Sequence, residues 1–115
     1  MTPGIVAAVV LAGGLGAVIR YGMTLLFARP WAVLLVNVVG SAVAGAVLGL
    51  AGDLDPGIRL ALVTGFAGGL TTYSTFAVET VELALEGRPW ASLGTVALSL
   101  VLGVGAAAAA YALTR

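Results

Sequence analysis

Four apolar runs, each about as long as a bilayer is thick, occupy nearly the whole chain. They cover about residues 4–27, 31–51, 58–86 and 91–113, and short polar turns separate them. Because a spanning helix needs roughly 20 apolar residues, these runs predict four transmembrane helices. Since 61% of the 115 residues are hydrophobic and only 9% are charged, no room is left for a soluble domain. The sequence therefore predicts an all-α integral membrane protein with residues 1–115 in a single domain.

The residue types that are missing exclude several kinds of chemistry. The chain has no cysteine, so it forms no disulfide and offers no reactive thiol. It also has no histidine, the commonest metal ligand and proton carrier. We therefore expect no enzyme activity, and nothing in the composition indicates a nucleic-acid partner. The first run lacks the basic flank of a signal peptide, so we expect it to be retained.

The third run is interrupted by two adjacent glycines and several hydroxyl side chains within residues 65–76. Gly68 and Gly69 each lower helix propensity by about 1 kcal/mol relative to alanine. The neighbouring hydroxyls can capture backbone carbonyls that a continuous helix would keep, and they belong to Thr71, Thr72, Ser74 and Thr75. The pattern predicts a third helix broken near residues 68–75. Broken helices at membrane depth line cavities and commonly hold ions, so we interpret this break as the functional site.

Two polar residues lie inside the first two runs, and each has two interpretations. Arg20 lies about two turns before the end of its run, so its side chain can reach the interface or draw anions into a vestibule. Asn37 lies in an apolar stretch, where an amide needs partners. It can bond to another helix or offer two donors to an anion.

Small and hydroxylated residues mark faces of the second and fourth runs. Ser41, Gly45 and Gly49 form a stripe that lets another helix approach closely. Thr95 and Ser99 lie one turn apart and form part of a polar track. Hydroxyls in membrane helices also bond their own carbonyls four residues back, so this track has a structural interpretation too.

The arginines near the ends of the runs do not favour one orientation in the membrane. Arg29 and Arg88 lie on one side, and Arg59 and Arg115 lie on the other. Orientation follows an excess of Lys and Arg on one side, so we expect insertion in both orientations. Four helices enclose a polar path poorly, and the glycine stripes invite partners. We therefore expect an antiparallel dimer in the lipid bilayer.

In such a dimer the centre of the broken helix meets its own copy. Carbonyls released near Gly68 and Thr71 of both chains would then face one point. Hard cations take oxygen ligands, so a monovalent metal ion on the dimer axis is one hypothesis. The alternative is that the hydroxyls and an ordered water satisfy those carbonyls.

Three segments, Gly13–Tyr21, Leu34–Ser41 and Gly65–Phe76, occur in order in the first three runs. Together they resemble one family, the Fluc (CrcB) fluoride channels. The resemblance implies a bacterial or archaeal cytoplasmic-membrane protein that forms an antiparallel dimer. It also implies two separate fluoride paths in that dimer and passive export of fluoride from the cell.

The resemblance also implies roles for individual residues. The carbonyls of Gly68 and Thr71 would bind a central structural sodium ion, and Phe76 would be one of the two pore phenylalanines of the family. A ring edge carries positive charge and can act as a weak anion ligand. The residues that we assign to the anion path are Asn37, Phe76, Tyr73, Thr75, Thr95, Ser99 and Arg20.

Two positions depart from the family pattern, which usually has Phe in place of Tyr73 and commonly Thr in place of Val33. Some relatives work as heterodimers whose subunits each keep part of the functional set. One subunit of an obligate heterodimeric fluoride channel is therefore an alternative to a homodimer.

Two further classes compete with a channel. A proton-coupled small multidrug exporter has a similar length and topology but needs an acid at mid-membrane in its first helix. The first run has no carboxylate, and Glu79 lies past the break in the third run. A non-conducting assembly subunit would only stabilise a partner, and its polar residues would be dispensable.

Overall fold

Three long helices account for most of the chain in the computed structural model, which describes residues 1–115. They are α1 (Pro3–Leu26), α2 (Trp31–Gly49) and α6 (Pro89–Thr114). Each is long and apolar enough to cross a membrane. Thr2 caps α1 by accepting the Ile5 N–H at 3.2 Å, and proline stands at the start of both α1 and α6, where its missing N–H costs nothing.

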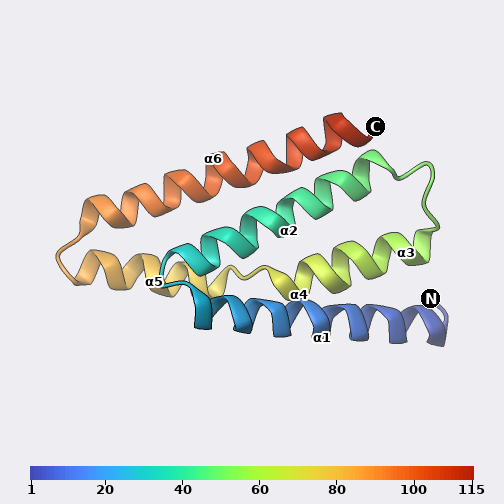
Figure 1. Cartoon of the computed structure of the whole chain (residues 1–115), viewed down its shortest axis with the longest axis horizontal. Helices are drawn as coiled ribbons and strands as arrows, with labels where there is room; N and C mark the ends of the chain where they lie inside the picture. Colours follow the sequence, from blue (N-terminus) through green and yellow to red (C-terminus); the bar gives the residue numbers. More distant parts are fainter.

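The remaining apolar run consists of shorter helical segments. In chain order they are α3 (Pro56–Leu60), the π-helical segment η1 (Ala61–Ala67), α4 (Gly68–Leu70) and α5 (Ser74–Leu85). Residues 71–73 between α4 and α5 are not helical, and Thr71 has extended backbone angles of φ −85° and ψ 158°. Figure 1 shows the chain leaving the helix between α4 and α5.

The helices lie side by side (Figure 1). Helix α1 packs against α3, η1 and α4, and α2 packs against η1, α4 and α5. Helix α6 packs mainly against α2 and, near its beginning, against α5. Both chain termini and the connection from α2 to α3 lie at one end of the molecule, and the α5–α6 connection lies at the other. We call the latter the α5–α6 end.

Glycines let α1 and the α4 region touch backbone to backbone. A Cβ atom added to Gly16 would lie 2.7 Å from the Leu70 nitrogen, and one added to Gly69 would lie 2.9 Å from the Gly13 carbonyl carbon. We expected Gly68 and Gly69 to weaken the helix locally, yet both are helical in α4. Gly69 is needed instead because α1 approaches too closely to admit a side chain.

The small-residue stripe of α2 faces α6 of the same chain. A Cβ atom on Gly45 would lie 2.8 Å from the Ala107 Cα, and one on Gly49 would lie 2.8 Å from the Tyr111 carbonyl oxygen. The expected close approach of a second helix is therefore met within the chain. These glycines consequently give no argument for a partner subunit.

Little of the chain is buried inside a single protomer. Leu70 and Leu83 are the largest fully buried side chains, at 2% and 1% exposure, and only 15 of 115 residues are buried. Large apolar side chains instead cover the outer faces of α1 and α6. Such surfaces are typical of a chain surrounded by lipid or by another protein subunit.

Candidate functional site

The side chain of Asn37 holds the non-helical residues 71–73 in place. Its Nδ2 donates to the Thr72 carbonyl at 2.9 Å, and its Oδ1 accepts the Thr72 N–H at 2.8 Å. In a continuous helix that N–H would bond to the carbonyl of Gly68. Asn37 therefore replaces the backbone bonds that are missing at this point. Its amide bonds to the non-helical backbone between α4 and α5, and its second N–H donor has no bond within the chain.

Arg20 binds the same segment from α1. Its Nη1 donates to the Thr71 carbonyl at 3.2 Å across a sequence separation of 51 residues. The guanidinium is therefore tied to the backbone at the break in the third run. It places a positive charge beside residues 71–73.

Hydroxyl groups complete the bonding around this segment. The Thr71 hydroxyl donates to the Ala67 carbonyl at 2.9 Å. The Thr72 hydroxyl accepts the Thr75 N–H at 3.2 Å, which satisfies a donor that the start of α5 leaves free. Thr72 thus anchors both sides of the segment. The sequence shows only a cluster of hydroxyls here and does not single Thr72 out.

A cavity of about 500 Å³ opens beside residues 71–73, and we call it the central cavity. It brings together four of the expected path residues: Asn37, Tyr73, Phe76 and Ser99. Its other lining residues are Ser41, Thr71, Thr72, Val96 and Leu100. None of the nine is charged, so the polar part of the wall consists of amide, hydroxyl and aromatic groups only.

The aromatic residues and Ser99 contribute differently to this cavity. The ring centroids of Tyr73 and Phe76 lie 6.1 Å apart with the rings tilted by 49°. Tyr73 is 79% exposed, so the cavity is open toward the outside of the protomer. The Ser99 hydroxyl is inaccessible to solvent and has no hydrogen-bond partner, which leaves its donor free.

Three of the expected path residues do not line the central cavity, namely Arg20, Thr75 and Thr95. Thr95 is buried, donates to the Ala91 carbonyl at 2.9 Å and lines a separate cavity near the α5–α6 connection. Threonines in membrane helices often bond their own helix in this way, so this contact fits the structural interpretation of Thr95. Ser99, one turn further, has no such bond.

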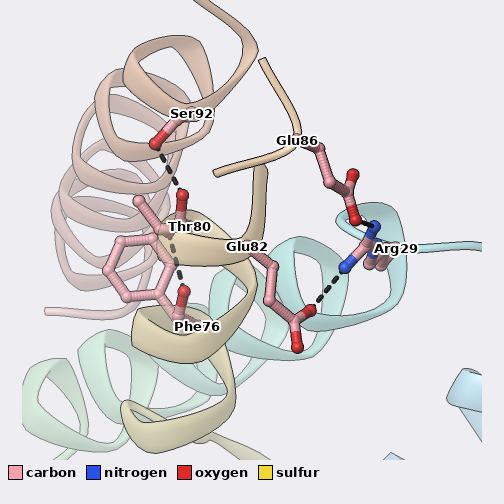
Figure 2. A network of polar contacts seen from close by, with 6 residues as sticks. All are labelled: Arg29, Phe76, Thr80, Glu82, Glu86 and Ser92. Atoms are coloured by element: carbon pink, nitrogen blue, oxygen red, sulfur yellow. Dashed lines mark hydrogen bonds and ion pairs between the residues drawn. The ribbon is translucent and has the colours of Figure 1, made fainter. Parts of the chain in front are cut away.

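A polar network ties α5 to its neighbours at the α5–α6 end (Figure 2). Ser92 of α6 donates to the Thr80 carbonyl at 2.7 Å, and the Thr80 hydroxyl donates to the Phe76 carbonyl at 2.7 Å. Phe76 is thereby linked through Thr80 to the start of α6.

Arg29 forms ion pairs with Glu82 and Glu86 in the same network (Figure 2). The hydrogen bond to Glu86, together with the charges of both carboxylates, raises the pKa of Arg29. These pairs fasten the α1–α2 connection to the last turns of α5. The sequence places Glu82 and Glu86 on one helix edge but gives no sign that Arg29 meets them.

The chain is similar in sequence to one protein family and to several of its members. Residues 7–111 match the family described as "CrcB-like protein, Camphor Resistance (CrcB)". The chain is 44% identical over 102 residues to the fluoride-specific ion channel FluC of Variovorax paradoxus, covering 83% of this chain and 82% of that protein. It is 43% identical over 117 residues to FluC of Renibacterium salmoninarum, covering 90% and 93%. It is 44% identical over 109 residues to FluC of Methanopyrus kandleri, covering 87% and 81%.

Proposed function

Because the chain belongs to the CrcB family, we propose that it is a fluoride-selective channel that lowers cytoplasmic fluoride by passive export. It is then an ion channel and not an enzyme. Its place would be the cytoplasmic membrane of a bacterial or archaeal cell. The observation that carries the proposal is the central cavity beside residues 71–73, which is lined by amide, hydroxyl and aromatic side chains and by no charged residue.

The chemistry of the central cavity suits a small, strongly hydrated anion. Fluoride gives up water only where other donors replace it. The free N–H of Asn37 is one such donor. The Ser99 hydroxyl, which has no partner in the chain, becomes a second donor when its side chain rotates toward the cavity. The edges of Phe76 and Tyr73 add positive partial charge without any cation that would hold the ion too tightly. No carboxylate lines the cavity to repel it, which also disfavours a proton-coupled exporter.

The contacts around residues 71–73 fix the donor groups in position. Two hydrogen bonds with the Thr72 backbone fix the plane of the Asn37 amide. This leaves the second N–H of the amide in a fixed direction, where it can donate to an anion. Arg20 supports the same backbone through Thr71 and adds a positive charge next to the path. We assign Asn37 to anion binding and Arg20 to holding the segment and favouring anions nearby.

We propose that two copies assemble as an antiparallel dimer with two paths. The exposed Tyr73 ring and the open side of the central cavity need a cover, and a second copy would provide it. The balance of Arg29 and Arg88 against Arg59 and Arg115 supports insertion in both orientations. A homologous second subunit would meet the same need, so a heterodimer stays the alternative.

A structural sodium ion on the dimer axis fits the backbone of residues 68–71 in part. The Thr72 N–H bonds to Asn37, so the Gly68 carbonyl lacks its helical donor. The Thr71 carbonyl accepts one bond from Arg20 and keeps a second lone pair. One chain thus supplies two oxygens, and two chains would supply four for a hard cation. When bound, the ion would offset the partial negative charges of these carbonyl oxygens and hold the two segments together.

Fluoride efflux from liposomes that contain the purified chain tests the proposed function. We expect passive release of fluoride down its gradient, no release of chloride, and no dependence on a proton gradient. Absence of fluoride release from the chain alone, with release restored by a homologous subunit, would replace the homodimer with the heterodimer. Absence of release in both cases would reject the channel.

A further inference from the structure

A groove of about 490 Å³ lies between the end of α2 and the α3–η1 segments, and we call it the α2–α3 groove. Its wall is apolar except for one charge and one hydroxyl, those of Arg59 and Thr64. Leu48 and Val63 in this wall are 65% and 37% exposed, so the groove is open to the outside of the protomer. An apolar groove with a single cation fits a partner surface that is apolar and carries an acid.

Two ionisable side chains of the third run have no partner within the chain. Arg59 makes no ion pair or hydrogen bond, and its Nε is inaccessible to solvent. Glu79 of α5 makes none either, and its Oε2 is inaccessible, while Arg29 is engaged by Glu82 and Glu86. Arg59 and Glu79 lie on opposite sides of residues 71–73, too far apart to meet in one chain. Unpaired charges in a membrane segment are costly, so both side chains need a partner from outside the protomer.

Helix α5 carries an exposed apolar face with this acid at its edge. Val78, Val81 and Leu85 are 56%, 56% and 82% exposed. Residues three and four apart are neighbours on a helix surface, so these three side chains form one stripe. Glu79 follows Val78 directly and therefore borders the stripe. The outer face of α5 thus has the chemistry that the α2–α3 groove lacks.

Arg59 and Glu79 lie at similar depths on the two sides of the proposed dimer axis. Arg59 precedes the middle of residues 68–71 by about ten residues, and Glu79 follows it by about ten. With a helical rise of about 1.5 Å per residue, each lies roughly 15–20 Å from that point. A two-fold axis there brings Arg59 to the level of the partner's Glu79. A parallel arrangement would instead set like charges side by side, which is unfavourable.

We infer that the α2–α3 groove receives α5 of a second, antiparallel copy, and that Arg59 forms an ion pair with the partner's Glu79. This inference rests on the antiparallel dimer of the proposed function and names the contact that selects its orientation. The two-fold axis makes the pair twice in each dimer. A homologous second subunit would need an acid and a base at the corresponding positions to take the same place.

Crosslinking tests the contact directly, because the natural chain has no cysteine to react. Chains that carry Arg59→Cys and chains that carry Glu79→Cys are made separately and together in membranes, and a short bis-maleimide reagent is added. We expect a crosslinked dimer from the mixture only. In either variant alone the two equivalent thiols lie roughly 30–40 Å apart, beyond the reach of the reagent.

Charge reversal tests the ion pair. Arg59→Glu and Glu79→Arg are co-expressed with different affinity tags, so that every mixed dimer has two opposite-charge contacts and every homodimer has two like-charge contacts. We expect at least about tenfold more mixed dimer than either homodimer, whereas wild-type chains with the same two tags should mix at random. A chain with both reversals should dimerise with itself again, which a parallel arrangement would not allow.

Three results would overturn the inference. They are the absence of a crosslink in the mixture, a crosslink in either single variant alone, and random mixing of the two charge-reversed chains. Fluoride release by the wild-type chain is measured separately. Release without these contacts would reject the inference and keep the channel, and the contacts without release would keep the inference and reject the channel.

Discussion

Replacement of Asn37 by aspartate separates the two tasks that the structure gives this residue. The aspartate side chain keeps an oxygen that can accept the Thr72 N–H but loses the N–H that donates to the Thr72 carbonyl at 2.9 Å. A buried carbonyl left without its donor costs about 1–3 kcal/mol. We therefore expect Asn37→Asp to lower stability by about that amount and still to fold and assemble.

The effect on conduction should be much larger than the effect on stability. A carboxylate about 4 Å from a passing anion repels it by about 4 kcal/mol at an effective dielectric constant of about 20. That energy corresponds to about a thousandfold slower fluoride flux. Acidic buffer should restore part of the flux, because a protonated carboxyl is neutral and can again donate to the Thr72 carbonyl.

The matched control is Asn37→Leu, which removes both contacts to Thr72 without adding charge. It should be less stable than Asn37→Asp, because both the N–H and the carbonyl of Thr72 lose their partners. The assay combines fluoride efflux from liposomes with thermal unfolding in detergent. Efflux through Asn37→Asp at the wild-type rate would remove Asn37 from the path and refute the reasoning.

Three other changes probe the packing, the free donor and the metal ion. Gly16→Ala should lower the free energy of unfolding by about 1–3 kcal/mol because its methyl group meets the Leu70 backbone, whereas Gly14→Ala, with nothing within 4 Å, should not. Equal thermal unfolding of the two variants would contradict the close contact between α1 and α4. Ser99→Ala should slow fluoride efflux several-fold and leave stability unchanged, since the hydroxyl has no partner to lose. A loss of stability without a loss of flux would show that Ser99 is structural and does not bind the anion. Replacement of sodium by a large organic cation should weaken the dimer in size-exclusion chromatography, and a dimer indifferent to sodium would reject the structural ion.

The long helices follow from composition because each apolar run is bounded by proline or by a polar turn. Arg29–Pro30 and Arg88–Pro89 mark the starts of α2 and α6 closely, and Pro56 marks the start of α3. In the third run the residues that leave the helix are 71–73, which lie within the predicted range of 68–75. The pattern of glycines and hydroxyl side chains therefore predicts the region in which the chain leaves the helix.

Sequence reasoning fails where a residue's role depends on a distant partner. Gly69 resembles a helix breaker until Gly13 of α1 is found against it. Asn37 and Thr72 are 35 residues apart, and no local pattern shows that they pair. Arg29 and Arg88 carry the same charge in similar Arg-Pro turns, and only the fold shows that the first forms ion pairs with two carboxylates.

The most direct test of the account is a structure of the purified protein determined in fluoride solution. The account predicts an anion in the central cavity, within hydrogen-bonding distance of Asn37 Nδ2, at the edge of the Phe76 ring, and with the Ser99 hydroxyl rotated to donate to it. A fluoride ion bound away from these groups, or a central cavity filled by lipid or by a partner side chain, would contradict it.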